Sequence, residues 1–89
     1  MRIDIWGNSS TCSLCIQLKQ FLENSNVEFN YYDLGSADVA KRVQYKKAFI
    51  SKKINSIPYI EIQGYEPMIG FTKEIKEELI KILKIGIDG

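Results

Sequence analysis

Residues 11–15 read TCSLC and contain the only two cysteines of the chain, Cys12 and Cys15. A disulfide between them would close a loop of four residues, so it cannot connect distant parts of a fold. Thiols react as thiolates, and a C-x-x-C pair near the start of a helix has pKa values lowered from about 8.5 to between about 3.5 and 7.5. The spacing therefore indicates redox chemistry, and the structural alternative is a pair of buried cysteines that only fill a helix interface.

The composition excludes several other uses of two thiols. A structural zinc site needs four cysteine or histidine ligands, and this chain has two cysteines and no histidine. We therefore expect no metal site. The same lack of histidine leaves a hydrolase of the Cys-His or Ser-His type without its base.

Length and charge limit the classes of protein that fit. A chain of 89 residues is predicted to form one domain, 1–89, around one core. Twelve basic and eleven acidic residues give a net charge of +1, without the basic excess of a nucleic-acid binder. No apolar run reaches the length of a membrane span, about 20 residues, and the opening MRID begins a strand pattern unlike a signal peptide. We expect a cytoplasmic monomer without nucleic-acid or membrane partners, in a compartment where structural disulfides are rare.

The hydrophobic periodicity places the cysteines between a strand and a helix. Residues 2–6 alternate apolar and polar side chains, which predicts a strand, and from Thr11 to Asn24 apolar residues recur at helical spacing. Cys12 then falls in the first turn, where free N–H groups and the helix dipole stabilise an anion. We expect Cys12 to be ionised and nucleophilic, with Cys15 one turn deeper on the same face as a shielded, ordinary thiol.

The remaining pattern predicts an α/β domain with the order β-α-β-α-β-β-α. The first two strands are expected to form a parallel βαβ unit, and a hairpin adds two antiparallel strands, which gives a four-stranded mixed sheet flanked by three helices. The other predicted strands are 27–34, 57–62 and 65–69, and the other predicted helices begin near 37 and 72.

Local signals predict how these elements begin and end. Ser36 is the expected N-cap of the second helix, and Gly64 supplies the positive φ of a tight hairpin turn. Pro67 cannot donate to a strand ladder, so the last strand should lie at a sheet edge or carry a bulge. Lys84 and Gly86 are the expected stop signals of the last helix.

A proline precedes the third predicted strand in the stretch Ser56-Ile57-Pro58. Such a proline is either an ordinary trans residue or a cis-proline retained for a purpose. Because the cysteine pair suggests a redox site, we expect Pro58 to be cis and to lie beside it, leaving the backbone of Ile57 free to pair with a thiol peptide.

Together, the TCSLC site, SIP before the third strand, the Gln63-Gly64 turn and IGFTKE before the last helix resemble the glutaredoxins and the glutaredoxin-like hydrogen donors of ribonucleotide reductase. The resemblance covers almost the whole chain and implies the thioredoxin fold. It implies a thiol-disulfide oxidoreductase that reduces protein or glutathione-mixed disulfides, with Cys12 as nucleophile, Cys15 as resolving thiol and Pro58 as cis-proline. The substrate or glutathione surface that it implies consists of Ser13, Leu14, Ile57, Pro58, Gly70, Phe71 and Thr72.

The departures from the family pattern concern the source of electrons. Typical glutaredoxins have Pro-Tyr between the cysteines, an upstream Lys and a Gly-Gly pair, whereas this chain has Ser13-Leu14, serines at 9 and 10, and Gly70-Phe71. The Gly-Phe turn is similar to that of the donors to ribonucleotide reductase, which take electrons from thioredoxin reductase. Glutathione, as reductant or ligand, and thioredoxin reductase both remain candidates.

Two further alternatives stay open. Some glutaredoxins with Ser after the nucleophile, as Ser13 is here, bridge two subunits through an iron-sulfur cluster, although we expect no permanently bound cofactor. A non-catalytic module would instead present the Lys-rich second helix, or the strand with Tyr31 and Tyr32, to a protein partner.

Overall fold

The computed structural model describes residues 1–85, so the expected stop signal at Gly86 lies outside the described residues. The elements along the chain are β1 (Ile3–Gly7), α1 (Ser13–Asn24), β2 (Asn30–Asp33), α2 (Val39–Ser51), β3 (Tyr59–Ile62), β4 (Met68–Ile69) and α3 (Lys73–Leu83). This order is the predicted β-α-β-α-β-β-α. Over residues 1–85 no helix is long and apolar enough to cross a membrane.

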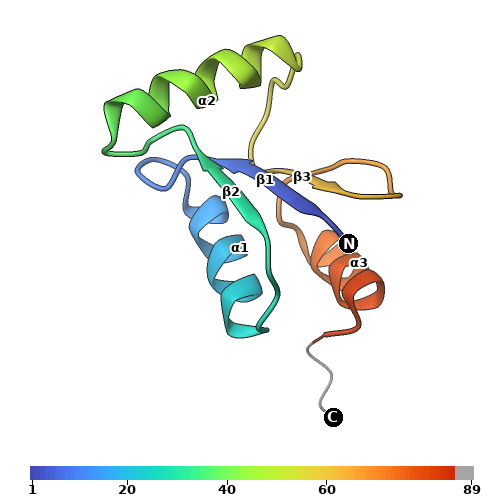
Figure 1. Ribbon diagram of the computed structural model, residues 1–89. Helices are drawn as coiled ribbons and strands as arrows, with labels where there is room; N and C mark the ends of the chain where they lie inside the picture. Colours follow the sequence, from blue (N-terminus) through green and yellow to red (C-terminus); the bar gives the residue numbers. More distant parts are fainter. Residues whose placement is uncertain (86–89) are drawn as a thin grey trace.

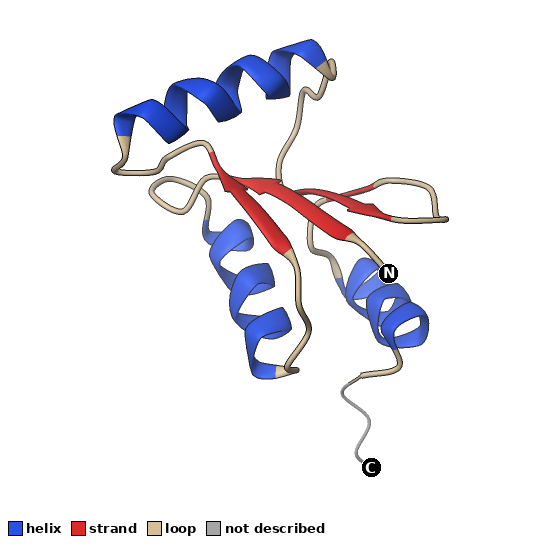
Figure 2. Ribbon diagram, in the orientation of Figure 1, coloured by secondary structure: helices blue, strands red, loops and turns tan. Residues whose placement is uncertain are grey.

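The four strands form one mixed sheet in the order β2-β1-β3-β4, shown in Figure 2. Strand β1 pairs in parallel with β2, where Ile5 lies opposite Tyr31, and antiparallel with β3, where Ile5 lies opposite Ile60. Strand β4 pairs antiparallel with β3 at the edge of the sheet, directly after Pro67. The predicted fold and the edge position of the last strand are confirmed.

The helices cover the two faces of the sheet unequally. Helices α1 and α3 lie together on one face, and α2 crosses the other face alone (Figure 1). The main core lies between the sheet and the α1-α3 pair, and its buried members are Ile3, Ile5, Leu18, Leu22, Ile60, Ile62 and Leu79. A second cluster beneath α2 contains Trp6, Leu34 and Ile54.

Capping residues account for where the helices begin and end. The sequence pattern begins the last helix near Thr72, and Thr72 is the N-cap of α3: its hydroxyl accepts a hydrogen bond from the Ile75 N–H at 3.2 Å. Lys84 ends that helix in the left-handed region, with φ of 54°. The prediction of Ser36 as the cap of α2 is wrong: Asp38 accepts from the Lys41 N–H, and Ser36 accepts from the Asp38 N–H two residues on.

The last three strands are shorter than the sequence pattern predicts, and β3 begins at Tyr59, two residues after its predicted start. The ladder of β2 begins at Asn30, three residues after the predicted start, because the Val27 N–H still bonds to the Leu22 carbonyl at the end of α1. Strand β4 contains two residues, since Pro67 has no N–H to extend the ladder toward the turn. Gly64, with φ of 88°, occupies the turn as predicted.

Candidate active site

Cys12 is the N-cap residue of α1, one position ahead of the first turn in which the sequence pattern places it. Its sulfur accepts hydrogen bonds from the backbone N–H of Cys15 at 3.3 Å and from the Cys15 thiol at 2.6 Å. These two donors, and the positive end of the helix, stabilise negative charge on the Cys12 sulfur. Cys12 is partly exposed, so a substrate can reach it.

Cys15 has no exposed surface and belongs to the buried side of α1. Burial, together with the hydrogen bond to Cys12, raises the pKa of the Cys15 thiol to about 12. The sequence predicts an ordinary, shielded thiol at this position, and the packing makes Cys15 much more reluctant to ionise. Both cysteines are free thiols, so the pair combines one accessible and one protected sulfur at close range.

Asp33, at the end of β2, fixes the loop that carries Cys12. Its carboxylate accepts hydrogen bonds from the Ser9 N–H at 3.0 Å, from the Ser9 hydroxyl and from the Gly35 N–H at 2.9 Å. Burial alone would raise the pKa of Asp33, but the bonds from Ser9 and Gly35 outweigh it and lower the pKa below its ordinary value. Sequence analysis missed this contact, although Ser9 follows the first strand and Asp33 lies near the end of the second strand of a predicted parallel pair, so that both lie at the same edge of the sheet.

Pro58 reaches the cysteine pair through the sheet register. The Ile57–Pro58 peptide bond is cis, and Pro58 is fully buried. The pairing of Trp6 with Tyr59 places Pro58 level with Gly7. A Cβ on Gly7 would lie 3.0 Å from the Cys15 sulfur, so Gly7 joins Pro58 to the redox pair.

The turn before α3 is tied to the same place. The Gly70 N–H donates to the Pro58 carbonyl at 2.8 Å, and Gly70 has a φ of 94°, which a side chain would strain. Thr72 follows as an exposed cap residue, and the ring of Phe71 packs against Phe21 of α1, with centroids 5.7 Å apart. The predicted residues 57–58 and 70–72 are thereby close together.

Ser13 and Leu14 lie at the exposed start of α1, and Leu14 is 42% exposed. Ile16, which the sequence analysis did not single out, is 37% exposed on the same turn and extends the apolar rim of the site. Its only sequence signal is an apolar residue off the buried stripe of α1. Over the described chain, no group of three or more acidic or cysteine side chains is arranged to hold a metal ion.

Comparison with known proteins bears on the fold of the whole chain. No family model matches the chain. It is similar in structure to a mutant of the thioredoxin-like protein BC3987, with a TM-score of 0.66 and 27% identity over 96% of this chain and 97% of that one. It is also similar to the glutaredoxin of Archaeoglobus fulgidus (TM-score 0.60, 22% identity, 90% and 86% of the two chains) and to NrdH-redoxin of Escherichia coli (0.61, 22%, 89% and 95%).

These likenesses confirm the predicted fold: the chain has the thioredoxin fold in the form found in glutaredoxins. One curated relative extends the comparison to the sequence. The gene 56 protein of Mycobacterium phage D29 is 33% identical over 69 residues, which are 78% of this chain and 72% of that protein. The chain belongs to the same family as that phage protein.

Proposed function

We propose that the protein is a glutaredoxin-like thiol-disulfide oxidoreductase that reduces protein or glutathione-mixed disulfides with Cys12 and Cys15. The observation that carries the proposal is the pairing of a partly exposed and a fully buried sulfur 2.6 Å apart at a helix start. A purely structural pair has no need for an accessible sulfur that accepts two hydrogen bonds.

In the proposed cycle, the Cys12 thiolate attacks a substrate disulfide, forms a mixed disulfide and releases the first substrate thiolate. Cys15 then gives up its proton and attacks the Cys12 sulfur. The Cys12–substrate bond breaks, and the second substrate sulfur leaves with the electron pair and takes a proton. Two electrons have passed from the cysteine pair to the substrate, and Cys12 and Cys15 are joined.

For the electron source, we favour a thioredoxin-reductase-like flavoprotein over glutathione. The loop ahead of Cys12 consists of Asn8, Ser9, Ser10 and Thr11 and carries no cation for a glutathione carboxylate. The structurally similar NrdH-redoxin is itself a glutaredoxin-like protein with a thioredoxin-like activity profile. A disulfide of ribonucleotide reductase is the corresponding candidate substrate.

The test is NADPH consumption by the oxidised protein in two mixtures, one with glutathione and glutathione reductase and one with thioredoxin reductase alone. We expect consumption with thioredoxin reductase, and its loss in Cys12→Ser. Consumption only with glutathione would reverse the assignment of the reductant. No consumption in either mixture, together with an unreactive Cys12, would reject the redox function.

The same preparations separate the other two possibilities. A cluster-bridged protein would be coloured and dimeric after anaerobic purification, whereas we expect a colourless monomer. A non-catalytic module would keep its partner after both cysteines are replaced by serine.

A further inference from the structure

Tyr31 of β2 carries a buried hydroxyl that the proposed cycle does not yet use. Its oxygen is inaccessible to solvent and has no hydrogen-bond partner within the described part of the chain. A buried hydroxyl without a partner is costly to the folded state. We therefore ask whether this hydroxyl forms a hydrogen bond in a state other than the reduced protein.

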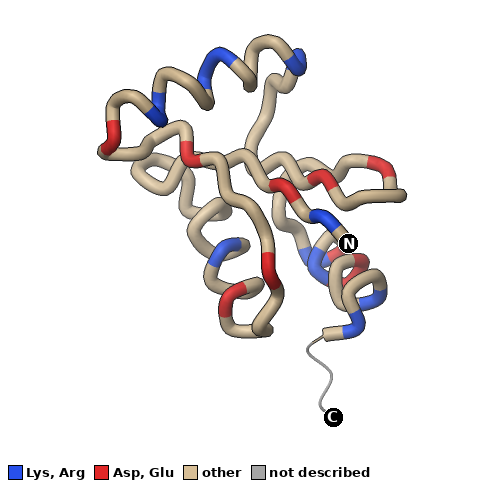
Figure 3. The backbone as a smooth tube through the Cα atoms, in the orientation of Figure 1, with Lys and Arg blue, Asp and Glu red and all other residues tan. Residues whose placement is uncertain are grey.

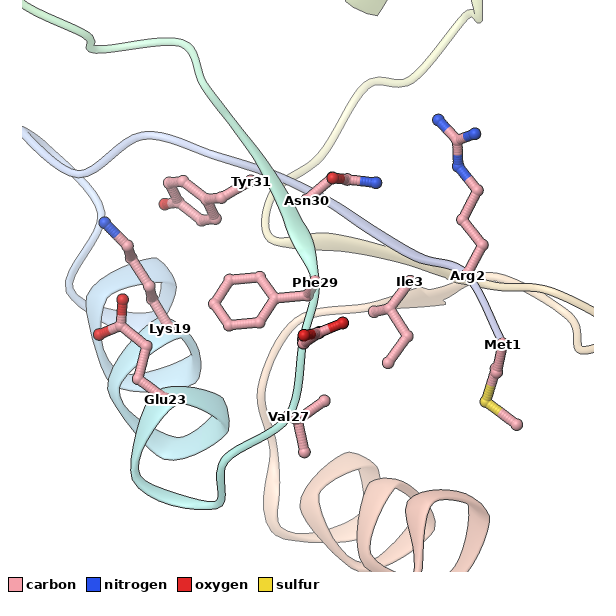
Figure 4. A pocket seen from close by; sticks show the side chains of 10 residues that line it. Met1, Arg2, Ile3, Lys19, Glu23, Val27, Phe29, Asn30 and Tyr31 are labelled. Carbon is pink, nitrogen blue, oxygen red and sulfur yellow. The ribbon is translucent and has the colours of Figure 1, made fainter.

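The hydroxyl faces the same small space as the resolving thiol. A Cβ placed on Gly7 would be 2.6 Å from the Tyr31 oxygen and 3.0 Å from the Cys15 sulfur, so both atoms border the space beside the bare Cα of Gly7. The two groups are not hydrogen-bonded to each other in the reduced protein. Figure 4 shows Tyr31 projecting from β2 toward α1, with Lys19 beside it. The Lys19 ammonium lies 5.1 Å from the centre of the Tyr31 ring.

The other charged or titratable groups that act on this hydroxyl are few. They are Cys12 and Cys15 of the redox pair and Asp33, two residues further along β2. Burial, with added repulsion from these groups, raises the pKa of Tyr31 above its ordinary value. The phenol therefore keeps its proton at neutral pH and remains a hydrogen-bond donor.

The surface pocket of about 600 Å³ in Figure 4 is a separate feature. Tyr31 and Lys19 contribute to its wall, and none of the residues that line it is among the predicted site residues. The Tyr31 hydroxyl faces Gly7 and Cys15, and the pocket contributes no residue to the redox site.

We propose that Tyr31 donates its hydroxyl hydrogen to the Cys15 thiolate when Cys15 resolves the mixed disulfide, an inference that rests on the proposed dithiol cycle. In the reduced pair, the Cys15 thiol donates to the Cys12 sulfur and needs no other partner. Once Cys12 is bonded to substrate, that acceptor is no longer an anion. The developing negative charge on Cys15 then needs a donor, and Tyr31 supplies one.

The step balances without any further reactant. The Cys15 proton passes to the leaving substrate sulfur, or to water when the leaving thiol is a strong acid. The Cys15–Cys12 bond forms as the Cys12–substrate bond breaks, and the electron pair leaves with the substrate sulfur. Tyr31 keeps its own proton throughout and lowers the free energy of the thiolate by a charge-assisted hydrogen bond.

The experiment compares Tyr31→Phe with Tyr32→Phe during the reaction of the reduced protein with 5,5′-dithiobis(2-nitrobenzoate). Attack by Cys12 releases one thionitrobenzoate, and resolution by Cys15 releases the second. Tyr32, the next residue of β2, is the matched control. Its side chain lies on the opposite face of the sheet from Tyr31, against the cluster beneath α2, and its hydroxyl donates to Asp4 of β1. We expect Tyr31→Phe to keep the first phase and to slow the second by about tenfold to a hundredfold, as for a lost hydrogen bond to a charge.

A pH profile separates this role from a structural one. The midpoint of the second phase should rise by about one to two pH units in Tyr31→Phe and stay unchanged in Tyr32→Phe. Thermal unfolding should show that Tyr31→Phe is as stable as the parent or more so, because the removed hydroxyl has no partner.

The outcomes distinguish this inference from the proposed function. An unchanged second phase in Tyr31→Phe, with two phases present in the parent, would overturn the role of Tyr31 alone. Release of a single thionitrobenzoate by the parent would reject the dithiol cycle and this inference with it.

Discussion

The two faces of the sheet are packed to very different degrees. On the face of α1 and α3, seven apolar residues are buried and a further set packs against them. On the face of α2, the described chain buries Trp6, Leu34 and Ile54, and α2 itself contributes no buried residue. The half-buried rings of α2 make its contact with the sheet: Tyr45 lies edge-on to Tyr32 with centroids 5.4 Å apart, and Phe49 lies 6.4 Å from the buried Trp6.

The difference shows which part of the fold holds the redox pair. Cys15 belongs to the tightly packed face, one turn before Leu18, and both side chains are fully buried. Helix α2 carries Lys41, Arg42, Lys46 and Lys47, of which the three lysines are exposed, and it contributes no predicted site residue. Basic residues are blue in Figure 3, which shows several along α2. Rigidity at Cys15 should therefore come from α1 and the sheet, with little dependence on α2.

The largest expected effect is on the α1 face. Leu18→Ala should lower the free energy of unfolding by about 3 to 5 kcal/mol, because it leaves a cavity in the core between the sheet and the two helices α1 and α3. Urea denaturation measures the loss, with the exposed Gln20→Ala of the same helix as control. A loss below about 1.5 kcal/mol would mean that this face is as loosely packed as the other.

The corresponding change under α2 should cost less. Phe49→Ala removes a ring that is only half-buried, so we expect a loss of about 1 to 2 kcal/mol, below the range for a fully buried aromatic. The rate of disulfide reduction at a temperature where the variant is folded should match the parent. Ile50→Ala, at a neighbouring position that is 73% exposed, is the control for helix propensity. A loss as large as that of Leu18→Ala would remove the contrast between the faces.

The next change concerns Asp33, which lies at the end of β2 and binds the loop ahead of Cys12. Asp33→Asn keeps an acceptor for Ser9 and Gly35 but removes the charge, so we expect a loss of about 1 kcal/mol at pH 7. The pKa of Asp33 is lowered in the folded state, so its contribution is present above the unfolded pKa of about 4 and is lost as the pH falls below it. The parent and the variant should therefore have similar stability near pH 2.

Urea denaturation at pH 7 and near pH 2 measures this convergence, with the exposed Glu28→Gln as control. Loss of equal size at both pH values would show that the carboxylate charge at Asp33 does not stabilise the loop.

Sequence patterns predicted the features that depend on local order along the chain. Helical spacing after Thr11 located α1 and the cysteines at its start, and the apolar stripe that follows Thr72 located the start of α3. Pro67 predicted an edge strand because its missing N–H excludes a central one. Each signal lies within a few residues of the feature that it predicts.

Sequence patterns did not predict the features that depend on contacts between residues far apart in the chain. The bonds from Ser9 to Asp33 join residues 24 positions apart, and the meeting of Tyr31 and Cys15 at Gly7 needs the register of β1 and β2 together with the packing of α1. The prediction of the N-cap of α2 was wrong for a different reason. Ser36 and Asp38 are both good cap residues, and the choice between them depends on where the loop after β2 ends.

The smallest expected effect tests whether the outer face of α2 is free. Val43 is 46% exposed in the middle of the helix, and lysine is the better helix former. Val43→Lys should therefore change the free energy of unfolding by less than about 0.5 kcal/mol, measured by urea denaturation, and leave the elution volume of the protein unchanged. A loss above about 1.5 kcal/mol with a later elution would mean that Val43 is covered in solution by another copy. In that case α2 is loosely packed only in the isolated monomer, and the contrast between the two faces of the sheet disappears in the dimer.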